Sequence, residues 1–437
     1  MLTRRRSTLH PFFALLVPSL VGLSACGASS SQPGAGVSVV HSAQSRNTSP
    51  QVPAVDMGIL AADNTKFAFD FYQKLAAGDD TGNLFFSPYS VSIALAMTYA
   101  GAKGETAQQM ATTLDFELPS ARLHPAFDAL DLALASRAQG QSGADGQPFE
   151  LNVVASVWGD RSLSFEQPFL DTLAVDYGAA VRTVDFSHAP DASRVAINDW
   201  ASSQTDHLIE NLLPPSSIGP DTLFVLVNAV DFSAGWATPF QASSTQPGTF
   251  HRLDGSTTQP PMMSEYLETT YAAGSGWQAV ALPYAGRTTS MVLIVPDADQ
   301  LGAVESSLSG DFVKSVFSSL AFAGVTLTMP KYTIQGATVS LKTELNALGM
   351  VDAFTDAADF GAMTKVPVLL SDVLQQAYLQ IDETGTKAAA ATAAILIPTS
   401  APAKNVTLAV DRPFFAIIRD DSTDTVLFVA RVLDPRG

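Results

Sequence analysis

The chain has 437 residues, of which 46% are hydrophobic and 15% are charged. This composition is typical of a globular protein and excludes a largely disordered one. The formal net charge of -18 argues against nucleic acid as a partner, because binding to a phosphate backbone needs clustered Lys and Arg.

The first 25 residues have the pattern of an export signal. Arg4, Arg5 and Arg6 precede an apolar run over residues 11–23, and Leu23-Ser24-Ala25-Cys26 follows. A basic region, a short apolar region and small residues before a cleavage point predict a secretory signal peptide over residues 1–25. The apolar run is shorter than the roughly 20 residues that span a bilayer comfortably.

Cys26 is the only cysteine, so the sequence predicts neither a disulfide nor a cysteine nucleophile. The Leu-Ser-Ala-Cys tetrapeptide resembles a bacterial lipobox, in which the cysteine becomes the lipidated first residue. We therefore expect a lipid on Cys26 that anchors an exported domain to a membrane of the cell envelope or outer surface. The alternative is an ordinary secretory signal with an incidental cysteine.

Two further parts follow the signal along the chain. Residues 26–55 are rich in Ser, Gly, Pro, Gln and Ala without periodicity, which predicts a flexible tether. Residues 56–437 contain no evident linker, so one folded domain is expected there.

Helical and strand patterns alternate within this domain without a strict βαβ rhythm. Helices are expected over residues 64–76, 90–99 and 341–348, the second of them opened by Ser87-Pro88. Strands are expected over residues 223–232, 278–283, 290–295, 325–329 and 425–433, and the last reads as a central strand because it is continuously apolar. The mixture predicts an α+β fold.

The sequence lacks the common catalytic and metal-binding patterns. Its six His residues are scattered, and none lies at metal-ligand spacing with Cys or acidic residues. There is no H-E-x-x-H motif, no G-x-S-x-G motif and no Walker-type loop. We expect no metal, no cofactor and no enzyme activity.

The segment over residues 380–402 combines conflicting preferences. The run from Ala388 to Ala394 favours a helix. Pro398 and Pro402 would end such a helix, and the run from Ile395 to Ile397 favours a strand. This segment is predicted to be able to adopt more than one conformation.

The same segment resembles the hinge of the reactive-centre loop in an inhibitory serpin. The matching hinge residues are Glu383, Gly385, Thr386, Ala388, Ala389, Ala390, Ala391 and Thr392. Other segments resemble serpin motifs in family order across residues 56–437: Asn83-Leu84-Phe85-Phe86-Ser87-Pro88, Asn228-Ala229-Val230, Leu282-Pro283-Tyr284, Met329-Pro330-Lys331-Tyr332, Asp411-Arg412-Pro413-Phe414 and Val426-Leu427-Phe428.

The resemblance implies a serpin fold with three β-sheets, surrounding helices and an exposed loop. It also implies a suicide substrate: a serine protease cleaves the loop and forms an acyl-enzyme, and the freed loop then inserts into the main sheet and deforms the trapped protease. The partner would be that protease, bound covalently by a monomeric inhibitor. The alternative is a non-inhibitory serpin-fold lipoprotein that binds a ligand or partner at its surface.

The alternation of side chains in a strand favours the inhibitor. Residues 386, 388, 390, 392 and 394 would share the buried face of an inserted strand, and all of them are Thr or Ala. Lys387 departs from the acidic residue usual in the family, but its parity puts it on the other, wetter face. A charge at 388 or 390 would have opposed insertion strongly.

Family spacing counted from Glu383 makes Thr399 the acyl donor and Ser400 the first residue of the leaving segment. A small, β-branched Thr suits the shallow pocket of an elastase- or subtilisin-like protease. A bond one or two residues away remains open.

The resemblance also implies two groups of residues that control opening of the sheet. Ser87, Ser90 and Asn228 match a polar cluster beneath the opening, where Gln375 replaces the usual His and cannot titrate near pH 7. At the top of the sheet, Lys331 and Glu383 match an ion pair near Trp236. Both groups are expected to govern opening and stability, not catalysis.

Overall fold

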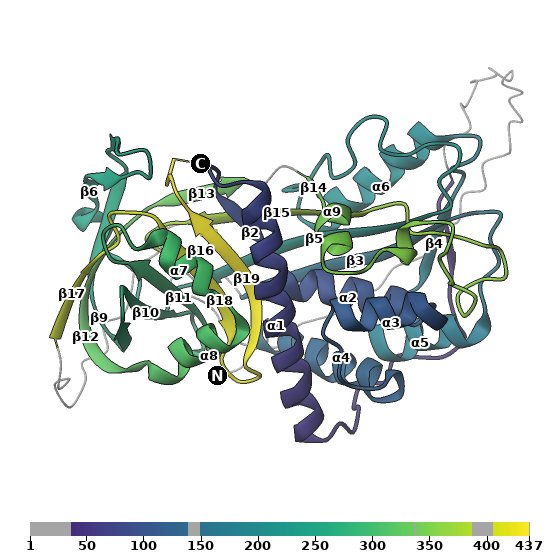
Figure 1. Cartoon of the computed structure of the whole chain (residues 1–437), viewed down its shortest axis with the longest axis horizontal. Helices are drawn as coiled ribbons and strands as arrows, with labels where there is room; N and C mark the ends of the chain where they lie inside the picture. The colour runs from purple at the N-terminus through teal and green to yellow at the C-terminus, as the bar shows by residue number, and fades with distance from the viewer. Residues whose placement is uncertain (1–35, 139–148, 336–337, 387–404, 437) are drawn as a thin grey trace, which may run out of the picture. The chain divides into compact units, whose positions relative to one another are not determined.

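A computed structural model describes residues 36–138, 149–335, 338–386 and 405–436 (Figure 1). The predicted signal peptide, Cys26, the hinge residues from Ala388 to Thr392, Thr399 and Ser400 lie outside the described residues.

The helices alternate with strands along the chain, as the sequence predicts. The helices are α1 Ala54–Gly78, α2 Pro88–Tyr99, α3 Gly104–Thr113, α4 Ser120–Ala135, α5 Gln167–Tyr177, α6 Pro190–Gln204, α7 Leu301–Ser307, α8 Gly310–Ser319 and α9 Lys342–Ala347. The strands are β1 Ser38–Val40, β2 Leu84–Phe86, β3 Glu150–Asp160, β4 Val181–Val184, β5 Phe224–Gly235, β6 Gln246–Pro247, β7 Phe250–His251, β8 Thr257–Thr258, β9 Pro261–Gly274, β10 Trp277–Pro283, β11 Thr289–Pro296, β12 Ala321–Pro330, β13 Tyr332–Gln335, β14 Val339–Ser340, β15 Val373–Ile381, β16 Gly385–Thr386, β17 Asn405–Ala409, β18 Phe414–Asp420 and β19 Thr425–Val432.

The main sheet has the strand order β1-β4-β3-β5-β16-β15-β13, with β14 paired to β15. Its central feature is the boundary between β5 and β15. The two strands pair directly and in parallel from Val373↔Leu226 to Ala377↔Val230. Further along, the two-residue strand β16 lies between them. We call this line of contact the β5–β15 seam.

The remaining long strands form a second path, β17-β12-β9-β10-β11-β18-β19-β2, with β6 paired to β9. The long strand β9 joins two sheets along this path: residues 262–271 pair with β12, and residues 271–274 pair with β10. The α+β prediction is confirmed. Strand β19 lies between β18 and β2 and is buried along its whole length, as its apolar sequence predicts.

Helices cover both faces of the main sheet (Figure 1). The side chains of β5 alternate between two apolar cores, as the period of a strand requires. Leu226 and Val230 belong to the large core shared with α1, α2 and α4, whereas Val225, Val227 and Ala229 belong to a smaller core beneath α6. The sheet is therefore packed on each side of the seam, and any opening must displace packed side chains.

Helix α2 begins at the signal that the sequence contains. Ser87 is its N-cap: the Ser87 hydroxyl accepts a hydrogen bond from the Ser90 backbone N–H at 3.2 Å, and Pro88 follows as the first helical residue. This start places the first turn of α2 beneath the seam, where its polar side chains meet Gln375.

The prediction of a flexible tether over residues 26–55 is wrong for its second half. Ser38–Val40 pair with β4 at the outer edge of the main sheet, Arg46 forms ion pairs with α4, and α1 already begins at Ala54. The packed domain therefore includes the described residues from Gly36 onward and does not begin at residue 56. Its attachments are long-range, and local composition does not reveal them.

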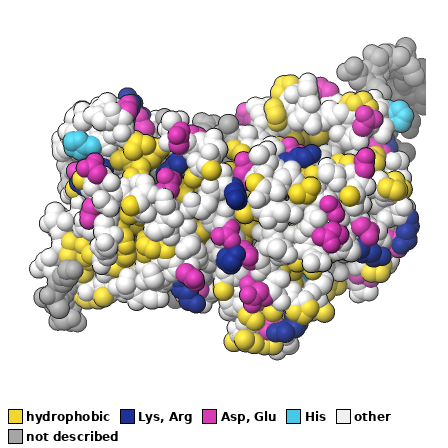
Figure 2. Space-filling model, viewed as in Figure 1, with side chains coloured by type: hydrophobic (Ala, Val, Ile, Leu, Met, Phe, Trp, Pro, Cys, Tyr) yellow, Lys and Arg dark blue, Asp and Glu magenta, His cyan; other side chains and the backbone are white. Residues whose placement is uncertain are grey.

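On the face seen in Figure 2, acidic and basic side chains are interspersed, and Lys and Arg do not gather into one area of that face. Lys66, for example, contacts both Asp70 and Asp115. Among the described helices, none is both long enough and apolar enough to cross a membrane.

Candidate functional site: the hinge and its supports

The start of the predicted reactive-centre loop already lies within the main sheet. Gly385 pairs with Gly235 and Thr386 pairs with Ala234 of β5, in antiparallel register. On the other side, Thr386 pairs with Ile381 of β15. These two hinge residues form β16 beside Ala234, Gly235 and Ile381, at what we call the upper end of the seam. An inserting strand would continue from this position in the same direction.

Gly385 passes very close to β5. A Cβ atom added at this residue would lie 2.2 Å from the Ala234 carbonyl oxygen and 2.7 Å from the Gly235 Cα. Backbone atoms on a paired strand cannot yield as a flexible side chain can, so any larger residue would push the hinge away. The glycine is required here by close approach.

Thr386 is fully buried, with no exposed area. Its Oγ1 is hydrogen-bonded to the Tyr284 hydroxyl at 2.7 Å, so this buried polar atom has a hydrogen-bond partner. Burial raises the pKa of the Tyr284 phenol well above its ordinary value, which keeps it a neutral hydroxyl. The inward direction of Thr386 agrees with the parity predicted for the hinge.

Trp236 supports the turn that leads into the hinge. Its indole ring stacks on Tyr284 with centroids 4.6 Å apart. Its backbone N–H donates to the Thr384 carbonyl at 2.8 Å, and its Nε1 donates to the Asp382 carbonyl at 3.0 Å. One buried residue therefore contacts both the turn and the phenol that binds Thr386.

Glu383 fastens the same turn to the neighbouring segments. Its carboxylate accepts from Lys331 Nζ at 2.6 Å and from Thr245 Oγ1 at 2.8 Å. Burial alone would raise the pKa of Glu383, but the hydrogen bonds from Lys331 and Thr245 outweigh it and the pKa is lowered. The structure thus brings Lys331, Glu383 and Trp236 together, and adds Thr245 to the group.

Asp382 and Tyr284 are supports that sequence reasoning did not single out. Asp382 Oδ1 accepts from the backbone N–H groups of Thr384 and Gly385 and from Thr384 Oγ1, which folds the turn on itself. An Asp whose carboxylate accepts from the N–H groups two and three residues later forms an Asx-turn. Asp382 before Thr384 and Gly385 therefore allowed this turn to be predicted from the sequence. Tyr284 stood in a recognised motif, but its bond to Thr386 joins residues 102 positions apart.

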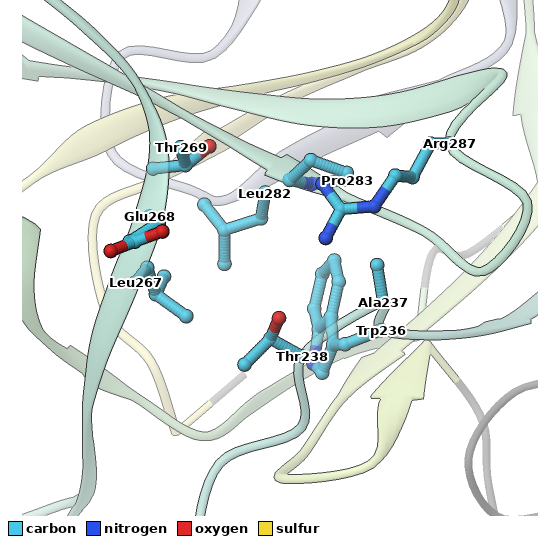
Figure 3. A pocket seen from close by; sticks show the side chains of 9 residues that line it. All are labelled: Trp236, Ala237, Thr238, Leu267, Glu268, Thr269, Leu282, Pro283 and Arg287. Atoms are coloured by element: carbon cyan, nitrogen blue, oxygen red, sulfur yellow. The ribbon is translucent and has the colours of Figure 1, made fainter. Parts of the chain in front are cut away.

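A small pocket opens directly beside Trp236 (Figure 3). Leu267 and Leu282 line it with Trp236, and the Arg287 side chain extends toward it from the turn after β10. Because Trp236 holds the hinge turn, this pocket lies against the support of the hinge.

The lower end of the seam is closed by the predicted polar cluster. Gln375 Nε2 donates to Ser90 Oγ at 3.0 Å and to the Ser87 carbonyl at 3.1 Å, and Gln375 Oε1 accepts from the Ser87 N–H at 3.3 Å. Ser90 Oγ donates to Asn228 Oδ1 at 2.6 Å. All four residues are buried. Gln375 lies on β15, Asn228 on β5 and the serines at the start of α2, so the cluster ties both strands of the seam to one helix.

The comparisons with known proteins agree with this arrangement. A family model described as serpin (serine protease inhibitor) matches residues 62–435. This chain belongs to the serpin family. The description of the family names inhibitors of serine proteases and not catalytic enzymes.

Two relatives and one solved structure illustrate the similarity. Human antithrombin-III is 32% identical over 387 residues, which cover 86% of this chain and 82% of that protein. A leukocyte elastase inhibitor from Xenopus laevis is 32% identical over 385 residues, 86% of this chain and 99% of that protein. The crystal structure of human thyroxine-binding globulin complexed with thyroxine is 28% identical, has a TM-score of 0.77 and covers 87% of this chain and 100% of that one. The serpin fold is thereby confirmed.

Proposed function

We propose that this serpin is a suicide-substrate inhibitor of serine proteases and that its Ala-lined loop inserts into the β5–β15 seam after cleavage. The observation that carries the proposal is the hinge itself. Gly385 and Thr386 already lie between β5 and β15, with the Thr386 side chain buried and hydrogen-bonded. Insertion then extends a strand that has begun, and needs no new site to form.

Insertion has a large driving force. Continuing β16 through the loop would add a strand of roughly 15 residues and about 20 backbone hydrogen bonds, each with a net value of about 1 kcal/mol. The summed free energy of these hydrogen bonds is at least as large as the ~5–15 kcal/mol that stabilises a typical protease domain. A strand of that length spans roughly 50 Å, enough to carry a covalently attached protease far from its docking position.

The resistance lies at the lower end of the seam. There the five register pairs from Val373↔Leu226 to Ala377↔Val230 must separate. The contacts of Gln375 with Ser87 and Ser90 must also break or rearrange, because Gln375 lies on β15 and the serines on α2. This group is proposed to set how fast the sheet opens.

The proposed target is an elastase- or subtilisin-like protease. The bond between Thr399 and Ser400 is the proposed reactive bond, since a small β-branched residue fits a shallow specificity pocket. We further propose that residues 1–25 are removed on export and that Cys26 carries a lipid, which would keep a monomeric inhibitor outside the cytoplasm at the cell envelope or outer surface.

The test is a mixture of the protein with a serine protease of small-residue specificity, analysed on denaturing gels. A covalent complex is expected, and N-terminal sequencing of the released fragment should begin at Ser400. The same protease with its active-site serine blocked is the control and should give neither complex nor fragment. Complete cleavage without any complex would contradict inhibition.

That last outcome would favour a non-inhibitory serpin that binds a ligand or partner. The similarity to thyroxine-binding globulin keeps this second candidate open. The small, buried Thr386 at the start of the hinge favours the inhibitor, because nothing bulky or charged opposes insertion there.

A further inference from the structure

The N-terminal segment over residues 36–53, which we call the strap, crosses the outer edge of the main sheet and two helices. At one end, Ser38, Val39 and Val40 pair with Thr183, Arg182 and Val181 of β4. Arg161 on the loop after β3 donates to the Gly36 carbonyl at 3.0 Å. The sheet therefore gains an eighth strand from a part of the chain that precedes α1.

Arg46 fastens the middle of the strap to α4. Its Nε donates to Asp128 Oδ1 at 2.8 Å and its Nη2 donates to Asp131 Oδ2 at 2.6 Å. The Asp128 side chain has no exposed area, so its charge depends on this partner.

Further contacts attach the strap to α5. The Ser42 hydroxyl donates to Asp171, and the Asn47 N–H donates to the Val175 carbonyl at 2.9 Å. Val40 and Val52 pack against the large core. The strap is thus fixed at the sheet edge, on α5 and on α4, by three independent kinds of contact.

These attachments bridge parts of the molecule that must move relative to one another. Opening the seam requires β5, with β3, β4 and β1 beside it, to shift away from β15. Helix α4 is held on the other side of this movement by apolar packing, because its Leu123 and Phe127 lie in the large core with Phe67 of α1. A strap anchored both on β4 and on α4 therefore resists a shift of the sheet edge over the helices.

We propose that the strap is a built-in brake on sheet opening, in which Arg46 is the positioning residue that holds the sheet edge against α4 and so preserves the unopened inhibitor. This inference rests on the proposed function, since it concerns the rate of the same insertion. It assigns a role to residues that lie before the segment matched by the family model, which begins at residue 62.

The carboxylates around Arg46 depend on its positive charge. Burial raises the pKa of Asp128 even though Arg46 opposes the rise. Burial and the nearby Asp128 also raise the pKa of Asp176, to about 6. Without the guanidinium, Asp128 would repel both Asp131 and Asp176 with no cation from the strap.

The test compares the full chain with its Arg46→Gln variant, each in the intact form and after loop cleavage by subtilisin. Arg46→Gln should lower the melting temperature of the intact form by several degrees and leave that of the cleaved form nearly unchanged. It should also shorten the half-life of protease-binding capacity at 37 °C by about tenfold, because the ion pair between Arg46 and α4, which sheet opening would have to break, is already absent. Arg46→Lys, which keeps one charge near Asp128, should restore part of that half-life.

Arg122→Gln is the matched control. It also separates an arginine from a buried aspartate, but Asp56 and Arg122 join α1 to α4 and do not reach the sheet edge. It should lower the melting temperature of both forms equally. Equal lowering of both forms by Arg46→Gln would overturn the brake, and so would an unchanged half-life.

The two proposals fail separately in this experiment. If the wild-type protein gains no heat resistance on cleavage, the proposed insertion fails, whatever Arg46 does. If the wild type gains it and Arg46→Gln behaves like Arg122→Gln, only the brake fails. Should Arg46→Gln not yield folded protein, Ser42→Ala removes the side-chain bond of the strap to Asp171 of α5 and is melted intact and cleaved with the same two outcomes.

Discussion

The two ends of the β5–β15 seam are built in opposite ways. At the upper end a third strand, β16, already separates β5 from β15, and its side chain Thr386 is bound by Tyr284. At the lower end the two strands pair directly, and Gln375 ties them to the start of α2. Insertion can therefore begin at the upper end without separating β5 from β15, whereas at the lower end it must first break their pairing. Changes at the upper end should affect entry of the loop, and changes at the lower end should affect opening of the sheet.

The largest effect is expected at the upper end, from Thr386→Arg. A guanidinium placed where Thr386 is fully buried would be an unpaired charge, costing several kcal/mol, so the hinge should leave the sheet. The variant should be cleaved as a substrate, and covalent complex on denaturing gels should fall by about a hundredfold, in line with such a loss.

Thr386→Ser is its control, because it keeps the hydroxyl that meets Tyr284, and it should retain complex formation. Undiminished complex from Thr386→Arg would show that the buried hinge position has no part in insertion.

A smaller effect is expected at the lower end, from Gln375→Ala. The change leaves the buried Ser87 and Ser90 without their amide partner, so the intact form should lose about 1–3 kcal/mol of unfolding free energy. Unlike Thr386→Arg, it should still trap protease, and it should open more readily on standing. Urea unfolding and the decay of inhibitory capacity measure the two effects.

Gln376→Ala, one residue along on the opposite face of β15, is the comparison and should change both quantities less. If the two variants lose equal stability and decay equally fast, the cluster does not guard the seam.

The smallest effect is expected from Lys331→Ala, which removes the partly exposed ion pair of Glu383 at the upper end. Such pairs contribute about 1 kcal/mol or less. Because the pKa of Glu383 is lowered in the folded state, its contribution is present above its ordinary value of 4.5 and is lost as the pH falls below it.

The wild type should therefore lose more stability than Lys331→Ala between pH 7 and pH 3.5 in thermal melts. Identical acid sensitivity in both proteins would exclude a role for this ion pair.

Local patterns in the sequence predicted much of this contrast. The Ser87-Pro88 start of α2 follows from capping chemistry, and the inward direction of Thr386 follows from the two-residue period of a strand. The gathering of Ser90, Asn228 and Gln375 came from family resemblance, since no local rule brings together residues on one helix and two strands.

What sequence reasoning missed depends on long-range contacts. The three residues of β1 lie in a stretch of tether-like composition, and only their pairing with β4 makes them a strand. Arg46 looks like a solvated cation until folding places it beside Asp128, 82 positions away. The Thr399–Ser400 bond lies outside the described residues and stays a prediction.

The position of β1 has a consequence for solubility as well. A strand at the margin of a sheet presents unpaired N–H and C=O groups that can recruit another chain. Here β1 covers that side of β4 with a three-residue strand too short to make an efficient template itself. A shortened chain that begins at α1 would expose β4, so we expect it to associate through this bare margin.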